Sequence, residues 1–329
     1  MLRKLLSFCC LISSTALATT FELPQEGSNI VGNVQYHKVQ KGENLSDIAK
    51  QYDVGFLALM AANKGIDPFV PPPDYVLTIP SEIILPQVKR EGIVVNIAEL
   101  RLYYFDPNQE VVHIFPIGIG RIGRDTPVME TTISQMVENP TWTPPASIRK
   151  EYLEKGIELP PVVPAGPDNP LGMFKMRLAY GAGDYLIHGT NKDFGIGMRV
   201  SSGCIRLSPT NIDWLFHQVH RGVKVKIINE PIKLSWEPDH ALYIEAHEPL
   251  TRSDGVKTEL TLPEDLTTWL QERHLSATKA RAAILAQNGL PIEVVSSEEW
   301  SEDREKMAHS DASSTSAANV PAVQGESSI

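Results

Sequence analysis

A cysteine and a histidine in the middle of the chain are the residues whose types and spacing suggest chemistry. Cys204 lies in the run Ser201-Ser202-Gly203-Cys204-Ile205-Arg206, sixteen positions after His188. A thiol attacks as its thiolate, and at a pKa of about 8.5 an ordinary thiol is only slightly ionised at neutral pH. An imidazole that faces the sulfur can take up the proton. The pair therefore predicts a cysteine nucleophile, Cys204, with His188 as its general base.

The elements around this pair are predicted to position it. His188 ends a strand predicted over 185–187, and Gly189 lets the backbone turn sharply after it. Beyond the cysteine, Ser208 is a good N-cap for a helix that begins at Pro209. We expect the positive end of this helix to lie near the thiol and to favour a thiolate–imidazolium pair.

Several neighbouring residues are predicted to bind the substrate. Gly203 and Cys204 can offer backbone N–H groups to an oxyanion without a side chain in the way. Arg206 lies on the same side of an extended segment as Cys204, and its fork of donors suits a carboxylate of the substrate or of the loop itself. Segment 191–198 is predicted to be a mobile loop between base and nucleophile. Further candidates for the wall of a cleft are Ser201, Ser202, Tyr185, Trp142, Phe194 and Arg199.

The amino terminus has the pattern of a secretory signal. Two basic residues precede an apolar run, and small residues before Thr19 supply a cleavage site, so residues 1–18 are predicted to be removed. Cys9 and Cys10 lie inside the apolar run, which leaves lipidation as an alternative. Cleavage would leave Cys204 without an intramolecular disulfide partner, which favours a chemically active thiol.

Composition and length narrow the class of protein. The formal net charge is −10, with 30 basic and 40 acidic residues, which argues against nucleic acid as a partner. A length of 329 residues predicts two or three domains, at about 100 to 200 residues each. The apolar run of the signal is shorter than the roughly 20 residues of a membrane span, and no later run replaces it, so we expect a soluble mature protein.

The chain divides into four predicted parts after the signal. Residues 36–80 have the pattern of a strand, two short helices and a strand. Residues 92–229 show short strands separated by turns, and they contain the histidine and the cysteine. Residues 230–298 are predicted to be a small α+β accessory subdomain, and 299–329 a disordered tail. Within the second part, the proline-rich segment 139–170 is predicted to be an ordered flap or a wall on the substrate side.

The first part resembles a LysM module. The residues that match the pattern are Tyr36, Val39, Gly42, Leu45, Ile48, Ala49, Val54, Leu59, Asn63 and Ile79-Pro80. LysM modules bind the N-acetylglucosamine backbone of peptidoglycan and chitin, so the resemblance implies attachment to a glycan wall. The three prolines at 71–73 depart from the usual final turn and put the shape of the binding groove in question. A helical spacer without a ligand is the alternative.

The second part resembles the L,D-transpeptidases of the YkuD-like family, through His188-Gly189-Thr190 and the run from Ser201 to Arg206. That family has a mostly β fold. The resemblance implies a mainly β catalytic domain, a YkuD-like β-sandwich with a helix after the nucleophile, beside a small βααβ LysM domain and a small α+β C-terminal subdomain. It implies Cys204 as nucleophile, His188 as base and Gly189 as the residue whose carbonyl orients the imidazole, with no metal and no cofactor. Many members have histidine at the position of Ser202, so hydrogen bonding to the acceptor or leaving group can differ here.

The implied reaction is cleavage of the meso-diaminopimelate–D-alanine bond of peptidoglycan tetrapeptide stems through a cysteine thioester. The acyl group passes to an amine, either a second diaminopimelate, which gives a 3-3 crosslink, or the C-terminal lysine of a murein lipoprotein. Water as acceptor would make the enzyme an L,D-carboxypeptidase. The implied location is the periplasm of a Gram-negative cell, where an exposed thiol of low pKa is predicted to need a thiol reductase as partner.

The residues alone leave two other classes of protein open, a metal-dependent hydrolase and a binding protein. His188 and Cys204 could be ligands of a hydrolytic metal, with His217 and His220 of the predicted helix as further ligands. A solvated helix face is the alternative for His217 and His220. The second rival is a peptidoglycan-binding protein without catalysis, with the LysM module as its working part.

Overall fold

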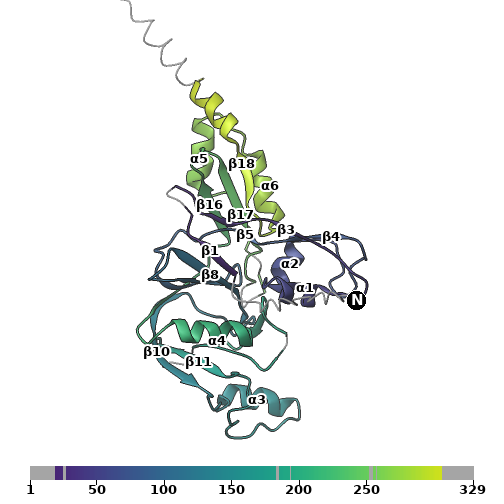
Figure 1. Cartoon of the computed structure of the whole chain (residues 1–329), viewed down its shortest axis with the longest axis vertical. Helices are drawn as coiled ribbons and strands as arrows, with labels where there is room; N and C mark the ends of the chain where they lie inside the picture. The colour runs from purple at the N-terminus through teal and green to yellow at the C-terminus, as the bar shows by residue number, and fades with distance from the viewer. Residues whose placement is uncertain are drawn as a thin grey trace, which may run out of the picture.

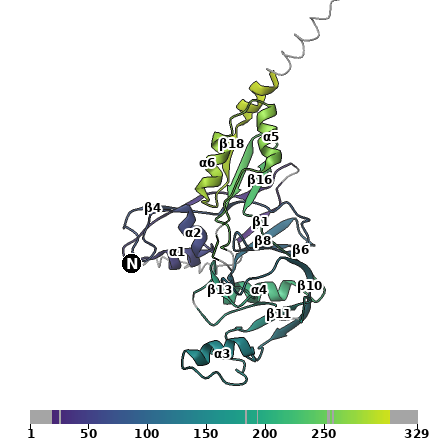
Figure 2. The same ribbon diagram turned by 180° about the vertical axis from the view of Figure 1, so that it is seen from behind.

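The computed structural model describes residues 19–24, 27–182, 185–192, 194–251, 255–256 and 258–305. The predicted signal, 1–18, and the last residues, 306–329, lie outside this range. Three units are visible in Figure 1: an N-terminal unit (35–79) at one side, a large sheet domain (92–228) below it, and a C-terminal unit (232–305) above, in green to yellow. Figure 2 shows the same three units from behind. Among the described residues, no helix has the length and apolar character that crossing a membrane requires.

The N-terminal unit has the predicted order of strand, helix, helix and strand. It contains β3 (Gln35–Lys38), α1 (Leu45–Gln51), α2 (Phe56–Ala62) and β4 (Val76–Ile79). The two strands pair antiparallel, with Gln35 opposite Ile79. The side chain of Asn44 caps α1 by accepting a hydrogen bond from the Asp47 N–H. Buried residues of both helices and of the strands close a small apolar core, in which Leu45, Leu59 and Leu77 are fully buried.

A nine-stranded sheet forms most of the sheet domain. Its strand order is β1-β8-β7-β6-β15-β10-β11-β12-β14. All neighbours pair antiparallel except β6 with β15 and β12 with β14, which are parallel. In chain order the strands are β1 (Thr19–Glu22), β6 (Gly92–Asn96), β7 (Arg101–Phe105), β8 (Val111–Pro116), β10 (Met129–Glu138), β11 (Phe174–Leu178), β12 (Leu186–His188), β14 (Ile205–Arg206) and β15 (Lys224–Ile228).

The sheet curls around one apolar core, against which helix α4 (Pro209–Gln218) packs. Strands from both ends of the sheet contribute, from Ile93 and Phe115 to Ile187 and Ile205. Smaller pairs complete the domain and its linkers: β2 (Ile30–Gly32) with β5 (Glu82–Ile84), and β9 (Ile119–Gly120) with β13 (Arg199–Ser201). The observed architecture confirms the predicted mainly β fold with a helix after the cysteine.

The segment 139–170, predicted to be a flap or wall, is ordered and carries helix α3 (Ala146–Glu154). Asn169 ties its two ends together from a fully buried position. The Asn169 amide donates to the Pro140 carbonyl over 2.7 Å and to the Pro164 carbonyl over 3.1 Å. A buried side chain with both donors in use holds the two ends of this long segment together, as expected for an ordered flap.

The C-terminal unit is an αβ layer with more strands than predicted. It contains β16 (Ile232–Trp236), β17 (Leu242–Ala246), β18 (Ile292–Val295), α5 (Glu264–Glu272) and α6 (Thr278–Ala286). Residues 297–305 are helical, and the Trp300 ring stacks on Trp269 with centroids 5.8 Å apart and planes 7° apart. The predicted tail from residue 299 is therefore wrong for 299–305, because Trp300 anchors this helix to the unit.

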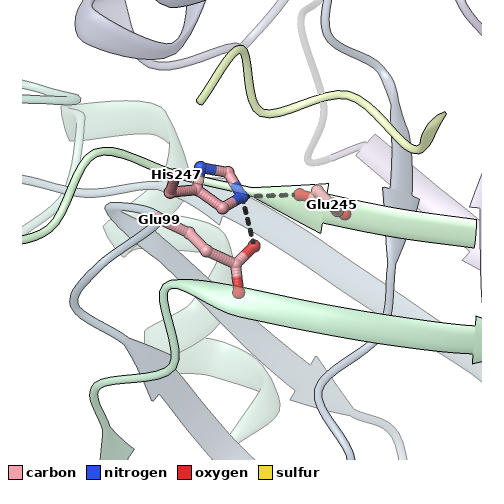
Figure 3. A group of neighbouring side chains, drawn as sticks. All are labelled: Glu99, Glu245 and His247. Carbon is pink, nitrogen blue, oxygen red and sulfur yellow. Dashed lines mark hydrogen bonds and ion pairs between the residues drawn. The ribbon is translucent and has the colours of Figure 1, made fainter. Parts of the chain in front are cut away.

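A buried charge network joins the C-terminal unit to the sheet domain. The carboxylates of Glu99 and Glu245 both face the Nε2 of His247, at 3.9 Å and 2.7 Å, as Figure 3 shows. The Arg101 guanidinium is 3.0 Å from Glu99 and 2.7 Å from Glu245, and the Lys233 ammonium is 2.8 Å and 3.1 Å from the same two groups. Burial by itself would raise the pKa of each carboxyl, but Lys233 and the other cations outweigh it and keep the pKa of Glu99 and of Glu245 below the ordinary value. Two carboxylates and two fixed cations thus balance inside the protein.

Candidate active site

A cleft of about 640 Å³ opens where β11, β12 and β14 end the large sheet. The sheet supplies one side of the cleft, and the flap segment 139–170 supplies another through residues that include Trp142. Six residues predicted for the site line this one cavity: Cys204, His188, Ser201, Ser202, Arg206 and Trp142. The fold therefore gathers the two motifs in one place.

Strand pairing explains why the histidine and the cysteine meet. In the parallel pair of β12 and β14, Ile187 lies opposite Ile205 and His188 opposite Arg206. Side chains alternate between the two faces of a strand, and both isoleucines are buried in the core. His188 and Arg206 therefore point to the other face, and Cys204, two residues before Arg206, shares it. The pairing sets Arg206 beside the imidazole, and Cys204, two residues before Arg206, lines the same cleft as the ring.

The imidazole of His188 is oriented by its own neighbour. Its Nδ1 lies 2.6 Å from the Gly189 carbonyl oxygen. A carbonyl only accepts, so Nδ1 carries the hydrogen and the lone pair of the neutral ring is on Nε2. The side chain is buried, at 5% exposure. This is the arrangement that a base acting through Nε2 requires.

The charge state of this ring differs from the prediction. Burial, and then the positive charge of Arg206, lower the pKa of His188 to about 4. The ring is therefore neutral at pH 7. The predicted thiolate–imidazolium pair is disfavoured, because the imidazolium would be buried beside a guanidinium. A neutral ring can still take the thiol proton during attack.

Arg206 is the cation nearest to the chemistry. Its backbone N–H and carbonyl each bond to Gly118 over 2.8 Å, which fixes the chain just after Cys204. Its Nε is buried and has no hydrogen-bond partner among the described residues. Burial lowers the pKa of Arg206, and the charge of Cys204 opposes that shift, so a thiolate and this guanidinium attract one another.

The predicted helix-end effect is not supported by the layout. Helix α4 is capped as predicted, with the Ser208 hydroxyl accepting from the Asn211 N–H. However, residues 208–211 line a different cavity, of about 470 Å³, between the N-terminal unit and the sheet domain. The positive charge that faces the thiol in the cleft comes from Arg206 and not from the start of the helix.

The predicted oxyanion site, with N–H donors from Gly203 and Cys204, differs from what the loop before the cysteine shows. The Gly203 N–H donates to the Ser201 hydroxyl oxygen over 3.2 Å, so this donor is already in use. The Ser201 hydroxyl in turn donates to the Cys204 carbonyl over 2.5 Å. Gly203 has φ +105°, and its carbonyl accepts from Thr126 Oγ1 over 2.9 Å. The loop is thus fixed by hydrogen bonds that consume one of the two expected donors.

The other candidates separate into two groups. Ser202 is exposed on the rim, and Trp142 lines the cleft as expected. Tyr185 lies behind the loop, where its ring would be 3.3 Å from a Cβ on Gly203, so it supports the loop and does not line the cleft. Two further candidates lie outside the cleft. Phe194 lines the cavity beside the N-terminal unit, and Arg199 pairs with Asp125 over 2.8 Å.

Three cations in the cleft were not predicted from the sequence. Lys175 and Arg177 extend from β11, where they lie opposite His188 and Leu186. Arg124 lines the cleft from the other side and donates to the flap residue Ser147 over 2.8 Å. The alternation Phe-Lys-Met-Arg-Leu over 174–178 was the available signal, because it places both cations on the face opposite the core. With Arg206, every charged side chain lining the cleft in the described part of the chain is basic.

The groups that could hold a metal lie elsewhere. Within the described residues, the three side chains whose ligand atoms come close enough are Glu99, Glu245 and His247. They do not fit a metal, because Arg101 and Lys233 already neutralise both carboxylates at hydrogen-bond distance. His217 and His220 are exposed and bond to carbonyls of their own segment over 2.8 Å, as expected for a solvated face.

Comparison with known proteins identifies the class. The chain matches the model of the L,D-transpeptidase catalytic domain over residues 90–227, that of the L,D-transpeptidase C-terminal domain over 231–294, and that of the LysM domain over 37–80. The Escherichia coli K12 protein named probable L,D-transpeptidase YcfS is 50% identical over 285 residues, which cover 85% of this chain and 89% of that protein. The chain belongs to the L,D-transpeptidase family, and it is an acyltransferase.

Two further relatives from Escherichia coli K12 support the same assignment. The probable L,D-transpeptidase ErfK/SrfK is 43% identical over 304 residues, which cover 89% of this chain and 96% of that protein. The probable L,D-transpeptidase YbiS is 41% identical over 287 residues, which cover 85% of this chain and 93% of that protein. The matches extend over most of each protein and confirm the predicted family and enzyme class.

Proposed function

We propose that the enzyme acts on tetrapeptide stems of peptidoglycan, with Cys204 as nucleophile and His188 as general base, and passes the acyl group of meso-diaminopimelate to an amine. One observation carries this proposal: a thiol and a neutral, oriented imidazole share a cleft in which the charged side chains of the described residues are all basic. A tetrapeptide stem is rich in free carboxylates, and Arg and Lys bind carboxylates through charge-assisted hydrogen bonds. The substrate and the cleft are therefore complementary in charge.

In the first half of the reaction, His188 Nε2 takes the thiol proton as the Cys204 sulfur attacks the carbonyl of diaminopimelate. The S–C bond forms, and the negative charge on the carbonyl oxygen is stabilised by the Cys204 N–H and by the nearby Arg206. The C–N bond then breaks, and the imidazolium returns its proton to the leaving nitrogen of D-alanine. A thioester remains on the enzyme.

In the second half, an amine attacks the thioester and His188 removes a proton from its nitrogen. The C–N bond forms, the S–C bond breaks, and the proton returns to the sulfur, so the thiol is regenerated. Because its pKa is about 4, the His188 ring is neutral before each step and can take up a proton as the nucleophile attacks. No group beyond those of the chain is needed for the balance of protons.

We propose two acceptors, the side-chain amine of a second diaminopimelate and the C-terminal lysine of a murein lipoprotein. Water as acceptor would give L,D-carboxypeptidase activity. The setting is the Gram-negative periplasm, reached by cleavage after residue 18, with the LysM module holding the glycan strand. A periplasmic thiol reductase keeps Cys204 reduced, because exposed and activated thiols oxidise first.

Product analysis tests the proposal. Purified enzyme is incubated with disaccharide-tetrapeptide alone, with a second stem as acceptor, and with a peptide ending in the lipoprotein lysine, and products are identified by mass spectrometry. We expect D-alanine release together with an amide-linked product for one of the two amines. Hydrolysis alone would show a carboxypeptidase. Activity that disappears after exhaustive chelation and returns with metal would favour the metal rival instead.

A variant separates catalysis from binding. Cys204→Ala should release no D-alanine and still bind isolated cell walls, since the N-terminal unit has its own core. Release of D-alanine at the wild-type rate by this variant would support the non-catalytic reading of the motif. Loss of both properties together with a lowered melting temperature would mean that the variant is misfolded.

A further inference from the structure

The N-terminal unit packs on the loop that leads from the histidine to the cysteine. The Leu57 N–H donates to the Gly197 carbonyl over 3.2 Å. The two backbones touch at Gly55 and Gly197, where a Cβ on Gly197 would lie 2.3 Å from the Gly55 Cα. Gly197 also has φ +70°, so both its conformation and this contact require glycine. Residues 194–198, defined here as the bridging loop, therefore touch the N-terminal unit at Gly197, and their other residues line the cavity of about 470 Å³ beside this contact.

The inner side of the bridging loop lies on the active-site arginine. The Gly197 N–H donates to the Ile117 carbonyl over 3.0 Å, which holds the loop against the sheet domain. A Cβ on Gly195 would be 3.2 Å from Arg206 Nη1, so the loop backbone covers the guanidinium. Arg206 lines the cleft together with Cys204, so the bridging loop connects the contact with the N-terminal unit at Gly197 to the cation of the active site next to Gly195.

A second contact fixes the N-terminal unit close by. Asn211, in the first turn of α4 and 2% exposed, donates its amide to Asp53 Oδ1 over 2.9 Å. The other oxygen, Asp53 Oδ2, is buried and has no hydrogen-bond partner among the described residues. This carboxyl therefore depends on one donor from the sheet domain, and losing that donor would leave both oxygens unsatisfied.

We propose that the N-terminal unit is a positioning part of the active site, which holds the bridging loop on Arg206 and so keeps the guanidinium directed at the cleft. This proposal rests on the proposed reaction. If the proposal holds, the N-terminal unit affects the turnover of a stem peptide even when the peptide carries no glycan. A module that only tethers the enzyme to the wall would have no effect on that substrate.

The physical reason is that Arg206 depends on packing for its orientation. Its Nε has no hydrogen-bond partner, so the side chain is held by the loop above it and by the sheet below it. A loop that lifts admits water and lets the guanidinium turn away from the thiol. Misplacement of a positioned group by about 1 Å can cost up to about 100-fold in rate.

The test places two carboxylates at the contact and then reverses the pair. Asn211→Asp sets a second carboxylate against Asp53, and the double variant with Asp53→Asn restores one amide–carboxylate hydrogen bond in the opposite sense. The matched control is Lys38→Glu, which sets like charges against Asp74 in an exposed pair of the same unit, 2.7 Å apart in the wild type. The substrate is the free tetrapeptide without sugar, and D-alanine release gives kcat and KM.

We expect Asn211→Asp to lower kcat/KM by about 10- to 100-fold, the double variant to recover to within about threefold, and Lys38→Glu to match the wild type. The His188 pKa, followed by NMR, is a second readout, because Arg206 lowers it and a displaced guanidinium lets it rise. Gly55→Val, which wedges the same contact from a residue of ordinary backbone conformation, should act in the same direction.

Three results would overturn the proposal: wild-type kinetics in a folded Asn211→Asp variant, a folded double variant that stays slow, or an unchanged His188 pKa in a slow variant. If Asn211→Asp does not fold, Gly55→Val decides by the same two readouts. No release of D-alanine by the wild type would instead refute the reaction itself, whatever the variants do.

Discussion

A single substitution at Arg206 should change the pKa of His188 without altering the imidazole itself. Arg206→Gln removes the guanidinium beside the imidazole and keeps a polar side chain of similar length. Burial is the larger cause of the lowered pKa of His188, and Arg206 is the second. We therefore expect the pKa to rise from about 4 and to stay below the ordinary value of 6.5.

The effect of His188 on the free energy of unfolding follows from these two pKa values, 6.5 and about 4. The difference between 6.5 and about 4 corresponds to roughly 3 kcal/mol against the imidazolium, at about 1.4 kcal/mol per pKa unit. Between these two pH values the unfolded chain binds more protons at this histidine than the folded chain. Acidification from 6.5 towards 4 should therefore cost up to about 3 kcal/mol of stability through this group, and the loss should be smaller in Arg206→Gln.

NMR titration of the labelled histidine ring, in a Cys204→Ala background, measures the pKa directly. Lys175→Gln is the matched control, because Lys175 lies opposite His188 on β11 but is not a cause of its lowered pKa. A wild-type pKa near 6.5, or an equal rise in the two variants, would refute the electrostatic account of the ring. The hydrogen on Nδ1 should be visible in the same spectra, since the Gly189 carbonyl fixes the tautomer.

The remaining predictions concern stability and substrate binding. Lys233→Met leaves two buried carboxylates with one fixed cation, so the free energy of unfolding in urea should fall by about 3 to 5 kcal/mol. Lys279→Met, in an exposed pair, should lower it by less than about 1 kcal/mol. Equal losses in the two variants would contradict the role given to the network. Burial raises the pKa of Asp53 from 3.8 to about 6, so its burial costs stability as pH rises across that range, and Asp53→Asn should melt higher above pH 6 and no higher below pH 4. Arg177→Gln should raise KM for the tetrapeptide about tenfold and leave kcat within about twofold; a change in kcat alone would exclude a binding role.

The residues that we propose to react could be identified in the sequence because their types and spacing carry the information. The strand before His188 and the short run before Arg206 have local signals, and parallel pairing of two such strands puts their matching faces together. The N-terminal unit was equally predictable, since the apolar spacing of its first helix and the residues of the LysM pattern lie in one short segment.

The charge state of the histidine could not be predicted, because burial and the guanidinium of Arg206 arise only when distant strands pair. Gly203 shows the same limit. Its N–H was predicted to serve an oxyanion, but the hydroxyl of Ser201 that occupies this N–H is a matter of side-chain rotation.

The missed elements of the C-terminal unit have a different cause. Strand β16 alternates Ile-Lys-Leu-Ser-Trp, but its two polar side chains are buried instead of facing water. Lys233 joins the charge network, and Ser235 bonds to the Asn29 N–H and to Glu237. The helix over 297–305 has an acidic, polar sequence, and its place is decided by Trp300 stacking on Trp269. Tertiary contacts that sequence periodicity does not encode determine both.

The claim on which the reaction depends is that the sulfur of Cys204 becomes acylated by the stem. Rapid quenching of enzyme with tetrapeptide in the absence of an acceptor, followed by intact-mass measurement and peptide mapping, tests it most directly. We predict a transient adduct equal to the stem without its terminal D-alanine, located on the peptide that contains Cys204 and absent from Cys204→Ala. Turnover of the tetrapeptide without any such adduct, or an adduct that persists in Cys204→Ala, would contradict the account.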